Sequence, residues 1–490
     1  MSSNSAPKLS GILLLGISIA GIVLGASFGV LAGIAPIIPV GIIGIVITLI
    51  CFLRNPSQFI LGFLVIRSSL DIFSAQQLPV AFAIVLDVLI ILYVVVALFR
   101  RQVIHTNIFW WFFVGWVLVQ GLWVILVPLG GVGFDASFLN GTAFDIAQRE
   151  WIRLFSWAMV YFMIMQLKDK VSPDTAISTL FLALWFPLFL ALLQTFVPSL
   201  LPPMFSGIDI PIPGSPEVLS RVRGTLGHPN TFATFLFLFI GLTYWKINYS
   251  QRRWFWLVIM VLLIFCYSTA KALFSVMMLG MMIFVLMAPR LNLFNAFAGI
   301  TGFTGIFALF SSTESSRKRF DSISGTPLFN LDLSIDRAIL LSQGDNNSFN
   351  WRLNLWTYLL KAAQNSPIWG FGLGSSYLVS PGRDILPHND YIRALLEGGQ
   401  VGFVCFLGFL IAQVIWLVRL IVSSPKGSKQ RSFCYTLLAI FMAIPVGMLT
   451  ENIWSHTTLF FYWFTLLAIA GWDWESQAEL NRHEQPPVLR

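Results

Sequence analysis

Long apolar runs recur along the whole chain and are separated by short stretches of polar residues. A bilayer core of roughly 30 Å needs about 20 apolar residues per helix, and many of these runs approach that length. The pattern predicts an all-α, polytopic membrane protein with about 12 to 14 transmembrane helices. We expect helices near residues 11–33, 36–53, 81–99, 108–128, 151–167, 176–197, 231–247, 254–269, 273–288, 293–312, 392–422, 432–450 and 457–473.

One shorter apolar run, 58–67, fits either a short spanning helix or a re-entrant segment. Cytoplasmic loops are enriched in Lys and Arg, so the basic residues test the two alternatives. If the run crosses and the N-terminus is cytoplasmic, both termini and the basic loops fall on the cytoplasmic side. The residues concerned are Arg54, Arg100, Arg101, Lys168, Lys170, Lys246, Arg252, Arg253, Arg290, Lys426, Lys429 and Arg431.

This topology predicts how the chain is organised. Residues 1–312 form an N-terminal transmembrane bundle that includes an outer, arginine-bearing loop at 198–230. Residues 313–390 form a large outer loop containing an amphipathic helix. Residues 391–473 form the C-terminal transmembrane helices, and residues 474–490 form a cytoplasmic tail.

Composition narrows the class of protein further. With 57% hydrophobic and 11% charged residues, the chain is not an ordinary soluble globule. The net charge of +8 is explained largely by the cytoplasmic loops, so we expect no nucleic-acid binding. The four cysteines lie singly, without the paired spacing of zinc or redox sites, and the outer histidines show no local metal-ligand spacing.

Candidate chemistry lies on the outer side. The stretch "LSRVRGTLGHPNTFATFLF", 219–237, carries Arg221, Arg223 and His228 just before a helix that begins near Asn230. A helix N-terminus attracts anions, and arginine donors suit phosphate. For either arginine, the alternative is snorkelling at the membrane interface.

A second cation lies in "CYSTAKALFSV", 266–276, where Lys271 separates two apolar helices at an outer hairpin. A lysine so close to the membrane is costly unless it has a partner. The alternative is an ordinary turn lysine.

In the large outer loop, "FNWRLNLWTYLLKAAQN", 349–365, spaces Trp351, Leu355, Tyr358 and Leu359 at helical intervals. The segment is too polar to span, so we expect an amphipathic helix along the outer membrane interface. The alternating glycines of "PIWGFGLGSS" follow it. They fit either a flexible turn or an anion-binding nest of backbone amides.

The stretch "LPHNDYIRALLEGGQVG", 386–402, opens with His388, Asn389 and Asp390 before a long apolar helix. Asn389 and Asp390 could hold the imidazole, contact a substrate or cap the helix, and we favour the cap for Asp390. Glu397 lies about two turns into this helix and needs a partner if it is buried. The glycines after it favour close packing of a neighbouring helix or lipid chain.

Together these motifs resemble the O-antigen ligase and polymerase family of bacterial polysaccharide assembly. "RVRGTLGHPNTFA" is similar to the family's arginine, Gly-Thr and Pro-Asn signature, and "NWRLNLWTYLLKAAQNSPIWGFGLG" to its arginine helix followed by Pro and glycines. "HNDYIRALLEGGQVG" resembles its His-Asn and Glu-x-Gly ending, and the order and spacing match over residues 219–403. "STAKALF" departs from the pattern because Lys271 stands where members usually carry arginine, which keeps the charge but loses bidentate hydrogen bonding.

The resemblance implies a membrane glycosyltransferase without cofactor or metal. It would transfer a glycan from an undecaprenyl diphosphate carrier to an acceptor hydroxyl at the periplasmic face of the bacterial inner membrane, with loop 313–390 periplasmic. The acceptor is a lipid core in a ligase and another carrier-linked glycan in a polymerase, and the form of the histidine motif favours polymerase. Membrane lipids and polysaccharide export and chain-length proteins are further expected partners.

The resemblance also suggests roles for the charged residues. Cations stabilise the diphosphate as it departs, and Arg221 and Arg352 are the first choices for this role, followed by Arg223 and Lys271. His388 is the candidate base for the acceptor hydroxyl, since an ordinary histidine pKa is about 6.5; alternatively, it only orients the acceptor.

The remaining polar residues of the motifs are candidate supporting or acceptor-binding groups. They are Asn389, Asp390, Glu397 and His228. His228 and His456 are also alternative bases.

Two other classes of function stay open. A transporter of a small anion such as bicarbonate would carry ionisable residues near the midplane, and Asp87 is central in a predicted span. A structural partner in an export complex would not need His388 together with the basic residues. The concentration of polar residues on the outer side favours an interfacial enzyme.

Overall fold

The computed structural model describes residues 48–126, 141–211, 218–290, 293–311, 348–380 and 386–474, with a few isolated positions between 327 and 341. The chain divides into two compact units, Met1–Ile60 and Leu61–Arg490. In the first unit the described residues, 48–60, are helical apart from Asn55. The helix predicted at 11–33 lies outside the described residues.

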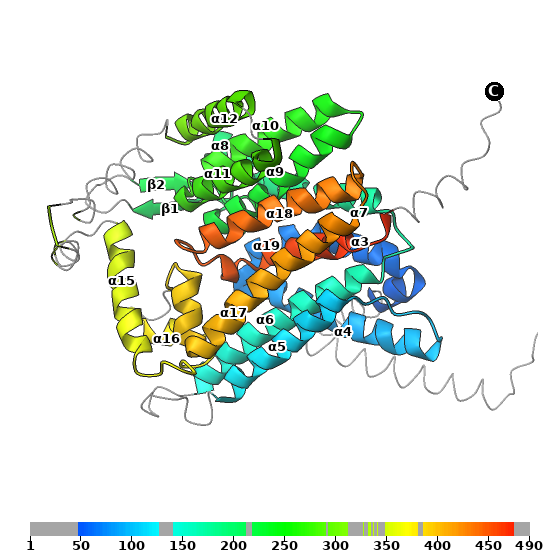
Figure 1. Ribbon diagram of the computed structural model, residues 1–490, viewed down its shortest axis with the longest axis horizontal. Helices are drawn as coiled ribbons and strands as arrows, with labels where there is room; N and C mark the ends of the chain where they lie inside the picture. The colour runs from blue at the N-terminus through cyan, green and yellow to red at the C-terminus, as the bar shows by residue number, and fades with distance from the viewer. Residues whose placement is uncertain are drawn as a thin grey trace, which may run out of the picture. The chain divides into compact units, whose positions relative to one another are not determined.

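The described part of the chain is almost entirely helical, as predicted (Figure 1). Its helices are α3 (Pro56–Ile66), α4 (Leu78–Phe99), α5 (Ile108–Leu126), α6 (Gly141–Met165), α7 (Pro173–Leu180), α8 (Trp185–Phe196), α9 (Pro229–Tyr249), α10 (Arg253–Thr269), α11 (Leu273–Met287), α12 (Leu293–Ser311), α15 (Ser348–Ala363), α16 (Ser376–Val379), α17 (Asp390–Ser423), α18 (Lys429–Gly447) and α19 (Thr457–Ala470).

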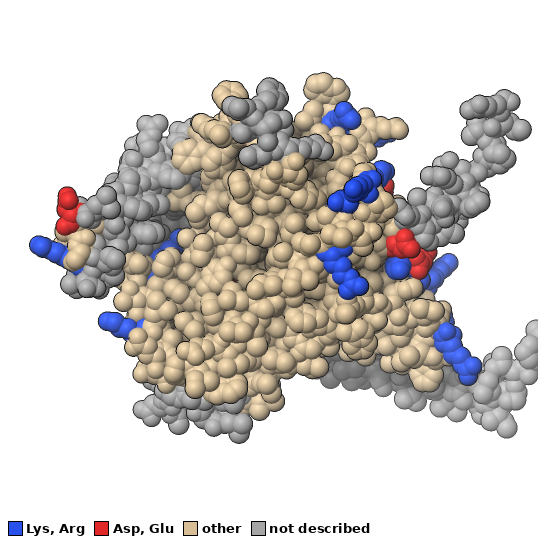
Figure 2. Space-filling view, in the orientation of Figure 1, with Lys and Arg blue, Asp and Glu red and all other residues tan. Residues whose placement is uncertain are grey.

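Several of these helices have the length and the surface of membrane spans. Among the described residues, five helices are long and apolar enough to cross a bilayer: Leu78–Phe99, Ile108–Ile125, Pro173–Phe196, Asp390–Ser423 and Lys429–Gly447. The wide central part of the face in Figure 2 carries no charged side chain. The prediction of an all-α membrane protein is therefore confirmed, whereas the total of about 12 to 14 spans and the outer position of the large loop stay predictions.

The helix predicted at 176–197 is interrupted. It consists of α7, a 3-10 turn at Phe181–Leu184, and α8. Pro187 has no N–H with which to continue the α-helical ladder to the carbonyl of Ala183. That carbonyl instead accepts a hydrogen bond from Ser68 Oγ at 2.7 Å.

The loop predicted at 198–230 contains a short β-hairpin that the apolar pattern did not reveal. Strand β1 (Ile208–Pro211) pairs with β2 (Val218–Arg221) in antiparallel register, with Ile208 opposite Arg221. The hairpin places Arg221 at the end of β2, immediately before the segment that leads into α9.

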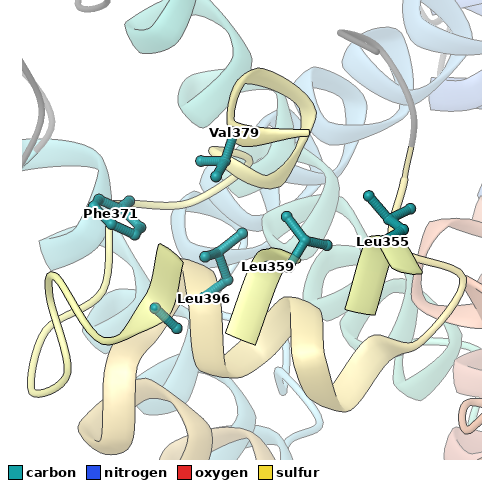
Figure 3. Packing of buried hydrophobic residues seen from close by; sticks show 6 residues of the cluster. Leu355, Leu359, Phe371, Val379 and Leu396 are labelled. Atoms are coloured by element: carbon teal, nitrogen blue, oxygen red, sulfur yellow. The ribbon is translucent and has the colours of Figure 1, made fainter. Parts of the chain in front are cut away.

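The predicted amphipathic helix is confirmed as α15. Leu355 and Leu359 on one face of α15 are buried against Leu396 of α17 and against Phe371 and Val379 from the segment between the two helices (Figure 3). This apolar seam attaches α15 to α17, because its members remove one another from water. Its position along a membrane interface stays a prediction.

Helices α9 and α19 form the interior of the second unit. Most residues of α9 and nearly all residues of α19 are buried. Both sequences are apolar around the whole circumference, which is typical of helices that are surrounded by other elements. At their N-terminal ends, His456 before α19 is buried, whereas His228 before α9 is exposed.

Candidate active site

The candidate site is centred on Glu451, in the short loop between α18 and α19. Its side chain is only 4% exposed. One carboxylate oxygen, Oε2, accepts a hydrogen bond from Asn230 Nδ2 at 2.6 Å and lies 3.9 Å from a guanidinium nitrogen of Arg352. The other, Oε1, lies 3.2 Å from His388 Nδ1. A buried carboxylate needs such partners, since its desolvation is costly.

Asn230 connects this carboxylate to the arginine loop. Its Nδ2 donates to Glu451, and its Oδ1 accepts a 2.6 Å hydrogen bond from Arg221. Arg221 is 5% exposed, and its Nε donates to the carbonyl of Ala270 at 2.9 Å. A continuous chain of polar contacts therefore runs from Arg221 through Asn230 and Glu451 to His388, so the two predicted motifs do meet.

Helix N-termini converge around Glu451. Asn230 lies in the first turn of α9, His388 immediately precedes the cap of α17, and Glu451 belongs to the loop that leads to α19. The helix dipole makes each such terminus electropositive, although cap side chains already bind amides at the starts of α9 and α17. The arrangement stabilises the Glu451 carboxylate.

The backbone around His388 is specifically held. His388 adopts φ +52°, a left-handed conformation that is uncommon for a residue with a side chain. The indole of Trp356 on α15 donates to the carbonyl of Pro387 at 2.6 Å, and the Trp351 ring contacts the imidazole edge-on with centroids 6.0 Å apart. The imidazole is 26% exposed, and no described residue hydrogen-bonds to its Nε2.

Asn389, rather than Asp390, caps α17, which corrects the sequence-based preference. Asn389 Oδ1 accepts hydrogen bonds from the amides of Tyr391 and Ile392, both at 3.0 Å. Asp390 is the first residue of the helix, and its Oδ2 accepts from the amide of Trp454 at 2.8 Å. Asn389 therefore positions His388 through the backbone, and Asp390 holds the loop that carries Glu451.

The pKa values of Glu451 and His456 are both lowered, but for different physical reasons. Burial by itself disfavours the charged form of Glu451, but the hydrogen bond from His388 and the charges of His388, Arg352 and His456 outweigh burial and lower the pKa of Glu451. Burial lowers the pKa of His456 to about 4, although Glu451 partly opposes this shift. His456 is thus neutral at pH 7 and a weak base, which favours His388 for proton transfer.

The two histidines considered as alternative bases, His228 and His456, have structural contacts. His456 is buried, and its Nδ1 pairs with Thr234 Oγ1 at 2.9 Å. His228 is the N-cap of α9, where its Nδ1 accepts from the amide of Asn230 at 3.1 Å. His228 therefore orients Asn230, which fits a supporting role.

The predicted cations divide into two groups. Arg221 and Arg352 converge on the site around Glu451. Arg223 instead donates to the carbonyls of Met204 and Ser206, so its guanidinium holds the loop before β1. Lys271, with φ +49°, donates to the carbonyl of Ser220 at 3.1 Å and thereby secures the hairpin beside Arg221.

Glu397 has the partners that its burial requires. Its Oε1 accepts from Arg393 Nε at 2.9 Å and from Ser376 Oγ at 2.5 Å. Arg393 also donates to Glu150 Oε2 and to Ser455 Oγ, both at 2.7 Å. This network joins α6, α16, α17 and the loop before α19, so Glu397 supports the framework and is separate from the Glu451 cluster.

The glycines after α15 allow the backbone of this segment to lie close to the backbone of α17. The amides of Phe371 and Gly372 donate to the carbonyls of Leu396 and Glu397 at 3.0 and 2.9 Å. Gly399 has φ +59°, and a Cβ there would lie 2.4 Å from the carbonyl group of Ile368. The amides of Phe371 and Gly372 are thus occupied by α17, so they are not available to form an anion nest.

Sequence reasoning missed Glu451 and Asn230 as site residues. Glu451 is an acidic residue in a short loop between apolar helices, where a charge needs a partner, and that signal could have identified it. Asn230 could not be distinguished from an ordinary residue of a first helical turn. Among the described residues, no group of three His, Cys, Asp or Glu side chains is arranged to hold a metal ion.

Comparison with known proteins supports the family resemblance. Residues 229–407 match the family model described as O-antigen ligase. The match includes Asn230, Arg352 and His388, whereas Arg221 and Glu451 lie outside it. A search of curated proteins found no match to the chain. Residues 229–407 are thus similar to the O-antigen ligase family, in agreement with the resemblance of the motifs.

Proposed function

We propose that this protein transfers a glycan from an undecaprenyl diphosphate carrier to an acceptor hydroxyl at the periplasmic face of the bacterial inner membrane. The family match indicates glycosyl transfer of the O-antigen ligase type and gives no support to the transporter alternative. The observation that carries the proposal is the convergence of His388, Arg352 and, through Asn230, Arg221 on the buried carboxylate of Glu451.

His388 acts as the general base. Its Nδ1 faces Glu451, so Nε2 is the atom available to an acceptor hydroxyl. As the acceptor oxygen bonds to the anomeric carbon, its proton passes to Nε2. The Glu451 carboxylate holds the imidazole in orientation and stabilises the positive charge that forms on it, in the manner of a base paired with an orienting acid.

Arg221 and Arg352 act on the leaving group. The bond between the anomeric carbon and the phosphate oxygen breaks, and its electron pair leaves with the diphosphate. Two guanidinium groups close to a set of helix N-termini stabilise that charge as it develops. Arg352 is 25% exposed and only loosely paired with Glu451, which leaves its guanidinium able to reach a phosphate.

The surrounding assignments follow from this function. The large loop 313–390 is periplasmic, and both termini are cytoplasmic. The acceptor is a second carrier-linked glycan or a lipid core, with polymerase favoured. Polysaccharide export and chain-length proteins are proposed partners.

Reconstitution tests the proposal. Purified protein in liposomes is given a glycan linked to undecaprenyl diphosphate, together with either a second carrier-linked glycan or a lipid-core acceptor. We expect a lengthened or transferred glycan, abolished in His388→Ala and Arg221→Ala proteins that insert normally. Uptake of a small anion without any glycan transfer would refute it.

A further inference from the structure

A cavity with a mostly apolar lining lies beside the candidate active site. The empty space in it, together with the open solvent at its mouth, amounts to about 450 Å³. Its walls come from α5, α6, α17 and the loop before α19. The lining residues that matter here are Trp116, Gln120, Trp123, Asp390, Arg393 and Trp454.

Two polar atoms in this cavity have no partner. Gln120 is 8% exposed and Asp390 is 1% exposed, yet among the described residues Gln120 Nε2 donates no hydrogen bond and Asp390 Oδ1 accepts none. Such buried, unsatisfied groups are rare and destabilising unless something else pairs with them. One is a donor on α5 and the other an oxygen on α17, a combination that suits hydroxyl groups.

The arginine that lines the cavity is already paired with acidic and polar side chains. Arg393 is bonded to Glu397, Glu150 and Ser455. The cavity therefore offers no unpaired cation to an anionic ligand such as a phosphate. The cavity atoms that lack a hydrogen-bond partner among the described residues are Gln120 Nε2 and Asp390 Oδ1. A donor together with an acceptor fits a hydroxylated ligand without charge.

Aromatic rings supply the rest of the wall. The indole N–H groups of Trp116 and Trp123 donate to the carbonyls of Cys405 and Trp369, at 3.1 and 2.8 Å, so both rings are held in place. What these side chains present to a ligand is largely apolar surface. Fixed aromatic surface beside a few hydrogen-bonding groups complements a pyranose ring, which has apolar C–H faces and a rim of hydroxyls.

The cavity shares two chain segments with the candidate active site. Asp390 is two residues after His388, and Trp454 is three residues after Glu451. We propose that this cavity binds a neutral sugar ring of the glycan substrate, a role that rests on the proposed glycosyl transfer. A ring held here would place the glycan next to the proposed base.

Direct binding tests this role separately from catalysis. Full-length His388→Ala protein in detergent is titrated with a panel of neutral sugars (glucose, galactose, mannose, rhamnose and N-acetylglucosamine) and with acyclic sorbitol, and followed by saturation-transfer difference NMR. We expect at least one ring sugar to bind and sorbitol not to bind. Gln120→Leu in the same background should weaken the binding of that sugar about fivefold, because one hydrogen bond is lost.

The variants are chosen so that misfolding does not explain their effect. Gln120→Leu removes an unsatisfied buried amide, and on packing grounds alone it should leave stability unchanged or increase it. Gly398→Ala adds a Cβ that would meet its nearest neighbours at an ordinary 3.7 to 3.8 Å, yet it narrows the cavity and should also weaken sugar binding. Gln102→Leu, the same substitution at an exposed position, is the matched control and should bind like the parent.

Each result decides the question. If no sugar in the panel binds, or if Gln120→Leu and Gly398→Ala bind sugar as well as the parent, the cavity is not a sugar site. If the variants lose sugar binding while no version of the protein transfers glycan in liposomes, the proposed function fails and the sugar site stands.

Discussion

His388 Nδ1 lies 3.2 Å from Oε1 of Glu451, although 63 positions separate the two residues in the chain. Glu451 is buried and His388 is partly exposed, so the carboxylate faces the interior and the imidazole faces the surroundings. This pairing makes Glu451 the inner partner of a proposed base, a position that the local motifs of the chain do not indicate.

Replacing Glu451 by glutamine should lower kcat by about 10²-fold, because the amide keeps the shape but loses the charge that stabilises an imidazolium. Initial rates of glycan transfer in liposomes measure the effect. Asp174→Asn is the matched control, since Asp174 pairs with Lys429 at 3.2 Å outside the site and its loss should leave kcat unchanged. A Glu451→Gln protein with full activity would contradict the assigned role.

The pH dependence of stability should differ between the parent and Glu451→Gln. Because the pKa of Glu451 is lowered from 4.5 in the folded protein, its ionised form stabilises the fold at pH values above its unfolded pKa. That contribution is lost as the pH falls through the folded value. Apparent melting temperatures in detergent should therefore converge in acid and diverge toward neutral pH; a constant difference would disprove the linkage.

Arg221 and Asn230 should behave as one unit. Arg221→Ala and Asn230→Ala each break the polar chain to Glu451, so the double variant should lose less transition-state stabilisation than the sum of the single variants. A double-mutant cycle on kcat/KM measures this coupling, which we expect to exceed about 1 kcal/mol. Asn107 is a distant control residue, whose side chain donates to Tyr161 at 2.7 Å. The effects of Asn107→Ala and Arg221→Ala on kcat/KM should be additive. If the effects were additive for Arg221 with Asn230 as well, the two residues would not act through one set of polar contacts to Glu451.

Substitution of Arg352 should affect activity, whereas substitution of Arg223 should affect stability. Arg352→Ala should raise KM for the lipid-diphosphate substrate or lower kcat by at least about tenfold, because a cation near the leaving group is removed. Arg223→Ala should mainly lower the melting temperature, since Arg223 donates to the carbonyls of Met204 and Ser206. Activity per folded molecule, measured beside melting curves, distinguishes the two effects. If Arg223→Ala mainly lowered activity and Arg352→Ala mainly lowered the melting temperature, the two assignments would be wrong.

The positive φ of Gly399 should make Gly399→Ala destabilise the protein by about 1 to 3 kcal/mol. The clash of the added Cβ with Ile368 should increase this loss. Gly408→Ala on the same helix is the control, because a Cβ there meets nothing within 4 Å and alanine is the better helix former. Thermal unfolding in detergent compares them. Equal melting temperatures would mean that the packing of the segment after α15 on α17 does not require this backbone approach.

Local patterns were sufficient for much of the fold. Apolar periodicity identified α9, α17 and α19 to within a few residues, and the helical spacing of Leu355 and Leu359 identified α15. The same patterns could not reveal the β-hairpin at 208–221, since four-residue strands leave little periodicity. They also placed the cap of α17 one residue late, because Asn and Asp are nearly equivalent as caps.

By itself the sequence determined that the protein is a helical membrane protein, that its polar motifs follow the order of the O-antigen ligase and polymerase superfamily, and that His388 is a candidate base. These features are local, since they depend on the composition and spacing of neighbouring residues. Only the tertiary structure decided which distant groups meet. Glu451 and Asn230 became central because the buried helices α9 and α19 bring their N-terminal ends to the start of α17, where a buried charge must find its partners across long separations in the chain.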